Sequence, residues 1–541
     1  MILIRKKELF LIQIFYFCRE QLKANTVTQP FFRKTALIAT SAMAATILYA
    51  QKATDTRPNI ILFMVDDMGW QDTSLPFASE KTPINERYHT PNMERLASQG
   101  MMFTQAYACA VSSPTRVSLM TGMNAARHRV TNWTLEKNKS TDEKSDILEF
   151  PEWNVNGICQ ISDIPFTYEV TTLPQLLKNS GYHTIHCGKA HWGAIDTPGE
   201  NPHHFGFEVN IAGYAGGGLA SYLGERNFGN RTDGISSPLQ AIPGLEKYWG
   251  KDIFATEALT LEAIKALEKA KKLGQPFYLY MSHYAIHIPI DKDKRFFQKY
   301  IDAGLSEKEA GYASLIEGMD KSLGDLMDWF EKNNLDKNTI IIFMSDNGGL
   351  SSSPTWRDTP LHTHNAPLNS GKGSAYEGGI REPMIVKWSG KVKPETRCDS
   401  YLIIEDFFPT ILDIAQVKER KTKQPIDGIS FMPMLKDNSF EYKKRSLYWN
   451  YPNLWGNEGP GIGPTCTIRK GEWKLIYYYE TGKKELFNIA NDIGETMDLS
   501  MLNPKIVKSL SLDLGEYLRS VDAQRPSFKA TGKKCPWPDE I

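Results

Sequence analysis

Three short runs of almost continuous apolar residues dominate the hydrophobic pattern of the chain. They cover Asn59–Val65, Pro276–Met281 and Thr339–Met344. Each run has the length of one strand, and a strand buried on both faces has this pattern because neither face meets water. Polar residues follow each run at once. The pattern therefore predicts buried strands with polar side chains at their carboxyl ends, where ligands bind in open α/β sheets.

Between these runs, apolar residues recur at helical spacing. Thr90–Gly100 and Thr172–Gly181 each read as a short helix with a threonine cap and a glycine end. The second leads into a predicted strand over 182–186. Residues 195–250 are rich in Gly, Asn and Pro, which predicts a long surface insertion that could line a substrate mouth. Further predicted elements are helices over 254–273 and 310–333, a strand over 384–388 and a helical pattern over 401–416.

The pattern changes in the last hundred residues. Alternating positions predict an antiparallel sheet, then a helix over 503–522, then a loose tail around Lys533. The predicted strands cover 446–449, 464–469, 473–479 and 484–488. We therefore expect three parts: a leader over 1–50, a main α/β domain over 51–445, and a C-terminal antiparallel subdomain with its tail over 446–541.

The N-terminal residues carry a targeting pattern. Arg33-Lys34 precede an apolar, small-residue run over 35–50, which is typical of a secretory signal peptide. A second apolar run, Leu9–Phe17, makes the leader unusually long. Neither run reaches the ~20 residues that a membrane span needs, so we expect export and no stable membrane span. The alternative is an uncleaved membrane anchor.

Composition narrows the classes of partner. The 541 residues include 63 Lys and Arg and 63 Asp and Glu, so no global basic field favours nucleic acid or an anionic membrane surface. Seven cysteines are scattered without Cys-x-x-Cys spacing, which excludes a disulfide scaffold but leaves room for a disulfide or two in an exported protein. Any anionic substrate must therefore meet local positive groups.

The stretch Ser112-Ser113-Pro114-Thr115-Arg116 offers such groups. Proline suits the first position of a helix and serine is a good N-cap, so we predict a helix that begins at Pro114 with Ser113 as its cap. Ser112 would then lie at the positive end of the helix, with Arg116 one turn away. This combination suggests attack on, or capture of, an oxyanion ester. The alternative is an ordinary capped helix.

Two pairs of oxygen-bearing side chains follow two of the buried strands. Asp66-Asp67 follow the first apolar run, and Asp346-Asn347 follow the third. Adjacent buried carboxylates are costly without a cation, and an all-oxygen set suits a hard cation such as calcium or magnesium. An Asx turn is the alternative for one pair alone. With both pairs present, the sequence predicts a metal site and no zinc site.

Other polar residues form smaller groups. Lys189 and His191 are two residues apart after a predicted strand, so an extended backbone would put both on one side. Lys372 stands between two glycines, where the backbone can approach a ligand. A surface charge or a satisfied histidine is the alternative for each. Candidate residues for reading a substrate are Arg127, His128, Trp356, Arg357, Asp358, His362 and His364; loop scaffolding is their alternative.

Together these motifs resemble those of the formylglycine-dependent type I sulfatases, over about Arg57 to Leu518. The central signature is Cys or Ser, any residue, Pro, any residue, Arg, and a later Thr-Gly. Here it reads Ser112-Ser113-Pro114-Thr115-Arg116 with Thr121-Gly122. The other matching motifs, in the order of the family, are Asp66-Asp67, Gly188-Lys189-Ala190-His191, Ala285-Ile286-His287, Asp346-Asn347-Gly348 and Gly371-Lys372-Gly373.

The resemblance implies a fold and a set of roles. The fold is alkaline-phosphatase-like: a large mixed, mostly parallel sheet flanked by helices, with a smaller C-terminal antiparallel sheet and helix. Ser112 is implied to be oxidised to formylglycine (3-oxoalanine) by an anaerobic sulfatase-maturating enzyme, in a bacterium. One Ca²⁺ would be held by Asp66, Asp67, Asp346, Asn347 and residue 112. The matching active-site residues are Arg116, Lys189, His191, His287 and Lys372.

The implied reaction is hydrolysis of a sulfate ester. A hydroxyl of the hydrated aldehyde attacks sulfur, the cations neutralise the sulfate oxygens, His287 protonates the leaving oxygen and His191 takes up a proton. The expected substrate is a sulfated glycan, with galactose or N-acetylgalactosamine sulfate preferred, in the periplasm or outside the cell. Two alternatives remain: a phosphate or phosphonate ester hydrolase of the alkaline-phosphatase superfamily, and a non-catalytic sulfated-glycan binder in which Ser112 is unmodified.

Overall fold

A nine-stranded sheet lies at the centre of the computed structural model, which describes residues 56–231, 240–456 and 458–541. Its strand order is β11-β2-β10-β9-β1-β8-β6-β7, with β12 also beside β2. Only β10 runs antiparallel to its neighbours, β9 and β2, so the prediction of a mixed, mostly parallel sheet is confirmed. The strands are β1 Asn59–Val65, β2 Met101–Tyr107, β6 His183–Gly188, β7 Val209–Ile211, β8 Phe277–Ser282, β9 Thr339–Ser345, β10 Arg381–Trp388, β11 Thr396–Cys398 and β12 Leu402–Ile403.

The three apolar runs become three adjacent strands. β1 lies between β8 and β9 and is parallel to both, and every residue of the three strands is buried. In this register Val65 is opposite Ser345 and Met64 is opposite Ser282. The polar residues that follow the strands therefore meet at one edge of the sheet, as the pattern predicts.

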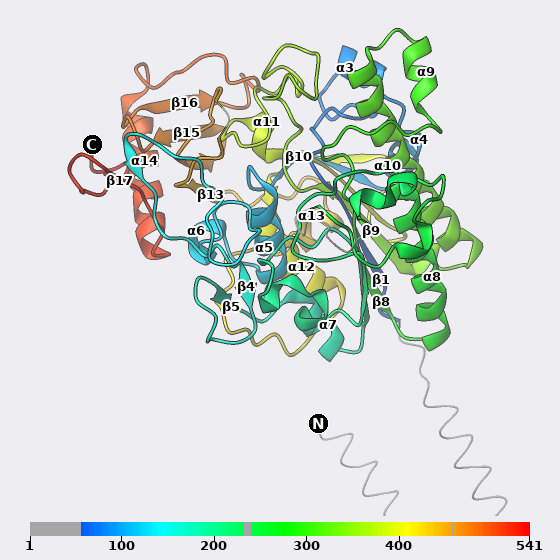
Figure 1. Cartoon of the computed structure of the whole chain (residues 1–541). Helices are drawn as coiled ribbons and strands as arrows, with labels where there is room; N and C mark the ends of the chain where they lie inside the picture. The colour runs from blue at the N-terminus through cyan, green and yellow to red at the C-terminus, as the bar shows by residue number, and fades with distance from the viewer. Residues whose placement is uncertain (1–55, 232–239, 457) are drawn as a thin grey trace, which may run out of the picture. The chain divides into compact units, whose positions relative to one another are not determined.

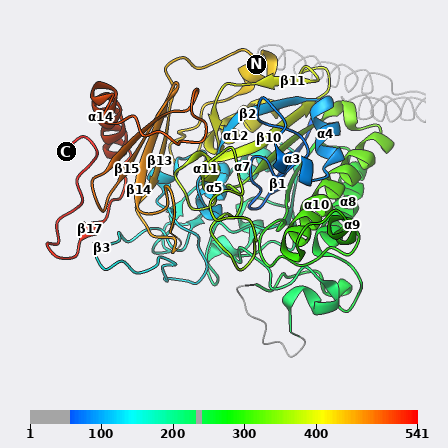
Figure 2. The same cartoon turned by 90° about the horizontal axis from the view of Figure 1, so that it is seen from above.

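Helices cover both faces of the sheet (Figures 1 and 2). Ile61, Phe63 and Val65 of β1 belong to a core shared with α4, α8 and α10, whereas the alternate residues Ile60, Leu62 and Met64 belong to a core shared with α5, α7 and α12. This alternation follows from the two-residue period of a strand. The helices are α4 Pro91–Ser98, α5 Ser112–Thr121, α7 Leu173–Asn179, α8 Ala255–Leu273, α10 Glu307–Lys332 and α12 Phe407–Ile414.

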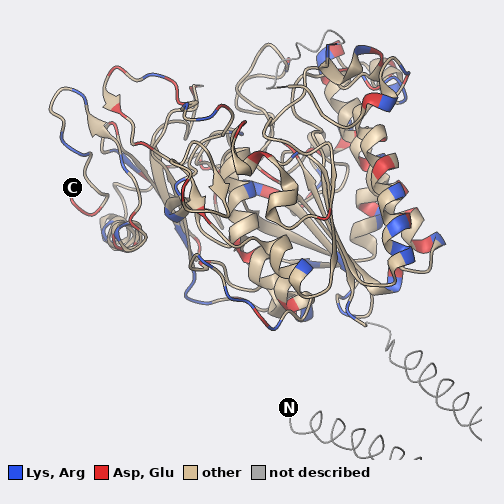
Figure 3. Cartoon of the chain, turned by 60° about the horizontal axis from the view of Figure 1, so that its bottom comes forward, with Lys and Arg blue, Asp and Glu red and all other residues tan. Residues whose placement is uncertain are grey.

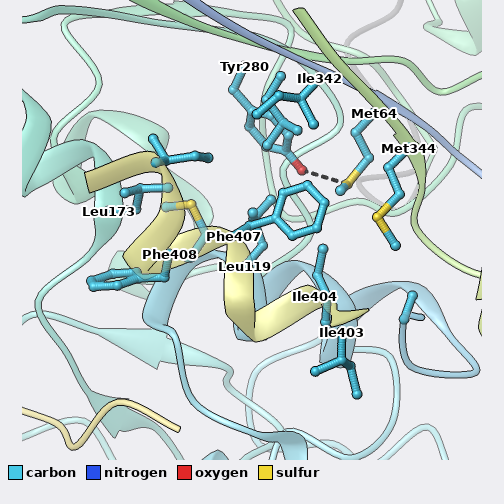
Figure 4. Packing of buried hydrophobic residues seen from close by; sticks show 14 of the residues in the cluster. Met64, Leu119, Leu173, Tyr280, Ile342, Met344, Ile403, Ile404, Phe407 and Phe408 are labelled. Carbon is cyan, nitrogen blue, oxygen red and sulfur yellow. Dashed lines mark hydrogen bonds between the residues drawn. The ribbon is translucent and has the colours of Figure 1, made fainter. Parts of the chain in front are cut away.

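The second of these cores positions α5 (Figure 4). Leu119 of α5 lies among Leu173 of α7, Phe407 and Phe408 of α12, and the strand residue Met64. The helical pattern predicted over 401–416 begins only at Phe407, because Leu402 and Ile403 pair with β2 as β12. On the other side of the sheet, the exposed faces of α8 and α10 carry charges of both signs (Figure 3).

The C-terminal sheet is confirmed. Its four strands are antiparallel in the order β13-β14-β15-β16, and α14 (Pro504–Ser520) shares a core with them. The two sheets belong to one compact unit, Arg57–Ile541, and the division at 445/446 stays a prediction. The strands are β13 Ser446–Tyr451, β14 Thr465–Lys470, β15 Trp473–Tyr478 and β16 Lys484–Asn488.

The expectation of a loose tail is wrong. β17 (Ser527–Phe528) pairs with β3 (Leu148–Glu149), and the Tyr477 hydroxyl donates to the Pro536 carbonyl oxygen at 2.9 Å. Cys535 and Trp537 are buried in the core of the C-terminal sheet. Apolar burial on both sides of Pro536 thus overrides the charged Lys533-Lys534 pair, which drew attention in the sequence.

The remaining elements are short. The predicted insertion is largely irregular, with β7 and four 3-10 helices, Pro198–Glu200, Pro202–Phe205, Gly224–Gly229 and Glu246–Tyr248. The other elements are α3 Pro83–Arg87, α6 Ala125–His128, α9 Phe297–Asp302, α11 Glu377–Ile380, α13 Met432–Lys436, β4 Ile158–Cys159, β5 Tyr168–Glu169, and the 3-10 helices Asp336–Asn338 and Ile404–Asp406.

Two sequence predictions concern export. The leader over 1–50 lies outside the described residues. Within the described ranges, all six cysteines are free and buried, so the allowance for a disulfide finds no support there. None of the helices described is both long and apolar enough to cross a membrane.

Candidate active site

Ser112 lies at the first position of α5, not ahead of it. The helix begins at Ser112, with Val111 as its N-cap and without a side-chain cap. The predicted start at Pro114 and the predicted capping role of Ser113 are therefore wrong. Ser113 instead accepts a hydrogen bond from the Thr134 N–H at 3.1 Å, which ties the helix start to the neighbouring loop. This tie leaves Ser112 as the hydroxyl at the positive end of the helix.

The Ser112 hydroxyl faces the ends of β1 and β9. Its Oγ lies 3.2 Å from Asp66 Oδ1 and 3.1 Å from Asn347 Oδ1, and it accepts a hydrogen bond from Lys189 Nζ at 3.0 Å. Ser112 itself is only 3% exposed. Residues 46, 77 and 235 positions away along the chain thus converge on one oxygen atom.

Three carboxylates crowd together beside this hydroxyl. Asp66, Asp67 and Asp346 each offer an oxygen within 4.8 Å of the others, and all three side chains are buried. Asp67 adopts a left-handed backbone conformation, φ 61°, and its N–H donates to Asp346 Oδ1 at 3.2 Å. An L-residue enters this region only when its surroundings require it, so the fold holds Asp67 in place at a cost.

Three cations balance the three carboxylates. Lys189 Nζ is 2.6 Å from Asp66, Lys372 Nζ is 2.8 Å from Asp67 Oδ2, and Arg116 Nε is 2.8 Å from Asp346. The pairing is uneven. Burial and the neighbouring Asp346 raise the pKa of Asp66 to about 8, whereas Arg116 and the two lysines outweigh burial at Asp346 and hold its pKa below its usual range.

This arrangement fits a hard divalent cation. Every candidate ligand atom is an oxygen: the three carboxylates and the Asn347 amide carbonyl beside Ser112. Crowded carboxylates repel one another, and a cation among them removes that repulsion. The donor set matches calcium or magnesium better than zinc, because the cluster contains neither histidine nor cysteine.

Arg116 reaches the cluster through Asp346. Its Nη2 also lies 2.7 Å from Asp346 Oδ2, whereas Nη1 donates to Ser282 Oγ at 2.5 Å and to the Lys189 carbonyl oxygen at 3.3 Å, and the side chain is fully buried. The guanidinium is therefore fixed between the ends of β8, β6 and β9. It does not point back at Ser112 Oγ, as one helical turn of spacing suggested, but its charge acts on the same cluster.

Two histidines lie near Ser112 in neutral form. His191 Nε2 donates to the Thr134 carbonyl oxygen at 2.9 Å, and His287 Nδ1 donates to the Ile288 carbonyl oxygen at 2.9 Å, so each ring keeps one unprotonated nitrogen. Burial and nearby lysines lower the pKa of both, that of His287 to about 3. His287 Nε2 lies 3.7 Å from Asp67 Oδ2. Both free nitrogens can therefore accept a proton.

A pocket of about 420 Å³ opens onto this site. The predicted insertion supplies Gly217, Gly218 and Gln240 to its lining. A Cβ on Gly217 would come within 2.4 Å of the His191 ring, so only glycine allows the insertion to approach the histidine this closely. The other lining residues are Asp67, Val111, Ser112, Trp133, Leu135, Lys189, His191, His287, Ile288, Leu350, Ser353, Trp356, Lys372 and Trp455.

Among the substrate candidates from the sequence, only Trp356 lines this pocket. The others do not line the pocket, and each contacts another residue of the protein. Arg127 forms a bidentate pair with Asp427, His128 bonds Ser118 and the Val130 N–H, Arg357 pairs with Glu309, Asp358 pairs with Lys308, His362 packs on Gly459 and His364 contacts Ser351. Their role as substrate contacts stays a prediction.

Sequence reasoning missed Trp133 and Trp455. Trp133 lies shortly after the signature helix, and Trp455 lies between two strands of the C-terminal sheet. An exposed aromatic residue in a polar loop is the one local signal that could have marked them. Trp455 is 83 residues beyond the last matching motif at Lys372, so its place at the site depends on how the two sheets pack.

Comparisons with known proteins identify the family and the fold. The profile of the sulfatase family matches residues 58–417, and the profile described as N-sulphoglucosamine sulphohydrolase, C-terminal, matches residues 371–524. A protein of Formosa agariphila named sulfatase is 29% identical over 520 residues, which are 87% of this chain and 89% of that protein. N-acetylgalactosamine-6-sulfatase of Mus musculus is 26% identical over 491 residues, 84% of each protein. The crystal structure of Ps i-CgsB in complex with k-i-k-neocarrahexaose is 27% identical, with a TM-score of 0.67 over 85% of this chain and 93% of that one.

Proposed function

The chain belongs to the sulfatase family and is a sulfuric ester hydrolase, and from this premise we propose that it removes O-sulfate from a sulfated carbohydrate with Ser112 converted to formylglycine and one calcium ion beside it. One observation carries the proposal: Ser112 Oγ lies within 3.2 Å of both Asp66 and Asn347, and it contacts Lys189, in the lining of a pocket. The residue that the family modifies is thus the residue on which the metal-binding oxygens converge.

Asp66, Asp67, Asp346 and Asn347 would hold the calcium ion, together with residue 112. Their crowding and uneven charge balance support this assignment. Calcium, when bound, offers charge stabilisation to sulfate oxygens, and hydrated formylglycine offers two hydroxyls on one carbon. The chain places both requirements within reach of one another, because Ser112 and the carboxylates already touch.

The remaining polar residues take roles that follow from their contacts. Lys189 and Lys372 pair with Asp66 and Asp67 through flexible side chains, so both can turn to the sulfate oxygens when a cation relieves the carboxylates. Arg116 is buried and fixed, so it holds Asp346 in place and keeps the site positive.

The histidines would move protons. His287 Nε2 is the atom that we assign to protonating the leaving oxygen, since the negative charge of a bound sulfate ester raises the low pKa of this ring. His191 Nδ1 is the atom that we assign to accepting a proton from residue 112. Its Nε2–H is held by Thr134, which fixes the ring with the free nitrogen available.

The proposed substrate is a galactose or N-acetylgalactosamine sulfate. The mouse relative is named N-acetylgalactosamine-6-sulfatase, and Ps i-CgsB was crystallised with a neocarrahexaose. These names belong to those proteins and support the proposal for this one. We further propose that the chain is exported to the periplasm or the medium of a bacterium, on the strength of its leader pattern, and that an anaerobic sulfatase-maturating enzyme modifies Ser112, because the motif has the serine form.

The test is anaerobic co-expression with such a maturating enzyme, followed by intact mass and assay of an aryl sulfate and an aryl phosphate. We expect the mass to fall by one H2, turnover of the sulfate ester to follow conversion, and Ser112→Ala to abolish both changes. Ser113→Ala is the matched control, since its hydroxyl bonds Thr134 and not the carboxylates. Full activity in Ser112→Ala would refute the formylglycine assignment, and preferential phosphate turnover would favour the phosphatase alternative. Conversion without hydrolysis would favour the glycan binder.

A further inference from the structure

Three tryptophans from distant parts of the chain line the pocket above the sulfate-binding end. Trp133 follows α6, Trp356 lies in the loop after β9, and Trp455 lies between β13 and β14. All three are half-buried, and none of their indole N–H groups donates to another residue in the described ranges. Aromatic faces that stay free in a pocket are available to a ligand.

Buried neighbours fix each ring. Trp133 precedes Thr134, which bonds both Ser113 and His191. Trp455 lies against Gly373, where a Cβ would come within 2.1 Å of the indole, and the Lys372 ammonium is 5.9 Å from the ring centroid. The Trp455 ring and the backbone next to Trp133 are therefore held in place before any ligand arrives, which lowers the entropy lost on binding.

Trp356 is anchored by the residue that follows it. Arg357 is 2% exposed, donates to both oxygens of Glu309 at 3.1 Å, and lies 3.7 Å above the Tyr312 ring. This arrangement gives Arg357, which the sequence marked as a substrate contact, a different task. It fixes the backbone beside Trp356.

Charge is distributed unevenly in the pocket. Among the described lining residues, the charged or titratable ones are Asp67, Lys189, His191, His287 and Lys372, and all belong to the Ser112 end. Apart from Ser112, the rest of the lining consists of aromatic and aliphatic residues, glycines, Gln240 and Ser353. A second sulfate or a carboxylate on the sugar would therefore meet no cation among the described lining residues except Lys372, which lies 5.9 Å from the Trp455 ring centroid and is paired with Asp67, and burying an unpaired charge is costly.

We propose that the three tryptophans form an aromatic clamp which selects a sulfate ester on a neutral pyranose ring and rejects uronic acids and sugars that carry a second sulfate. The C–H groups on the face of a neutral sugar stack on indole rings, and the free indole N–H groups donate to its hydroxyls. This inference rests on the proposed function, because it names the sugar that the same site receives. The inference concerns the charge of the sugar. The binding measurement determines which position of the sugar carries the sulfate.

The test measures binding, so that it does not depend on turnover. Calorimetry would use the full chain with Ser112→Ala and calcium, titrated with inorganic sulfate, each monosulfated galactose, monosulfated glucuronates and a galactose disulfate. We expect at least one galactose monosulfate to bind about 10-fold more tightly than the glucuronates and the disulfate. In the same background, Trp356→Ala and Trp455→Ala should each weaken that sugar about 10-fold and leave inorganic sulfate unchanged.

Trp473→Leu is the matched control, because Trp473 is also half-buried but lies on β15 away from the pocket. Equal binding of the charged sugars, or tryptophan variants that bind the galactose sulfate as well as the parent, would overturn the inference. So would sulfate binding without binding of any sugar sulfate, a result that leaves ester hydrolysis itself standing. Failure of Ser112 to convert would contradict the proposed function and leave these binding results unaffected.

Discussion

Two of the buried charge clusters in the described part of the chain differ in whether like charges crowd together. At the Ser112 site, three carboxylates crowd within 4.8 Å of one another at a pocket. In the second cluster, Lys474 of β15 pairs with Glu377 at 3.1 Å and Glu495 at 2.8 Å, and Arg381 of β10 pairs with Glu377 at 3.2 Å. Lys474 lies between the two carboxylates, and Tyr107 and the Glu377 N–H donate to the remaining oxygens, so every carboxylate oxygen there has a cation or a donor beside it.

Burial and charge therefore do not mark a functional site by themselves. The second cluster joins the large sheet to the small one, and none of its residues lines the 420 Å³ pocket. The first leaves like charges together beside a cavity, an arrangement that is stable only with something else present. Crowding next to a pocket, and not burial, separates the site from the scaffold.

The largest effect should come from removing one of the crowded carboxylates. We expect Asp346→Asn to lower kcat/KM about 1,000-fold, because the site loses a proposed metal ligand and the partner that orients Arg116. The folded state should persist, since the change also removes carboxylate repulsion. The measurement is kcat/KM of matured protein beside its circular dichroism spectrum. Activity within a few fold of the parent would place the metal elsewhere.

Breaking the second cluster should lower stability and leave activity near that of the parent. Glu377→Gln leaves Lys474 and Arg381 short of a partner in the interior, and we expect the free energy of unfolding to fall by about 4 kcal/mol. Urea unfolding measures that loss, and kcat/KM of the folded fraction should stay near that of the parent. A loss of activity as large as that in Asp346→Asn would erase the distinction between the two clusters.

Metal removal separates the clusters without relying on activity. Calcium at 100 times its dissociation constant should stabilise the folded chain by about 2.7 kcal/mol, and a chelator should reverse this gain. Glu377→Gln should respond to calcium as the parent does, whereas Asp346→Asn should lose most of the response. Thermal unfolding with and without calcium measures the response of both variants. An equal response in the two variants would contradict the assignment of Asp346 as a ligand.

A buried group without a charged partner gives the smallest of these effects. Burial lowers the pKa of His128 from 6.5 to about 3, and its Nδ1 accepts a hydrogen bond from the Val130 N–H. Below pH 6.5 the unfolded chain binds a proton that the folded chain refuses. Stability from this group is therefore complete above pH 6.5 and falls as the pH drops towards 3, by about 2 kcal/mol at pH 5.

His128→Asn tests this slope, because an amide oxygen can accept from the Val130 N–H without titrating. Urea unfolding at pH 7 and pH 5 should show a smaller difference for the variant than for the parent. His186, whose pKa burial also lowers to about 3, remains as an internal reference. An unchanged slope would mean that His128 titrates normally in the folded chain.

The sequence predicts the polar residues around Ser112 better than the aromatic residues that form the walls of the pocket. The buried strands, the carboxylate pairs and Ser112 were visible because apolar runs and the residues after them are local patterns. The walls were not, because Trp455 reaches the pocket only through the packing of two sheets. The same limit applies to Arg127, His128 and Arg357. They lie near the motifs in sequence, but they do not line the pocket. Polar residues close to a motif in sequence can pack behind the site as readily as they line its pocket.

The pairing of β17 with β3 has a consequence for the order in which the chain is synthesised. Asp142, a few residues before β3, accepts hydrogen bonds from Asn132, next to Trp133, and from Asn453, near Trp455. The pairing of β17 with β3 therefore secures a segment that contacts the loops of two tryptophans of the pocket. A ribosome delivers Ser112 well before Ser527–Phe528. The helix that begins at Ser112 can form while translation continues, but the segment behind the pocket is secured only when Ser527–Phe528 emerge. A nascent chain, or one truncated before β17, would therefore carry Ser112 in an unfinished pocket.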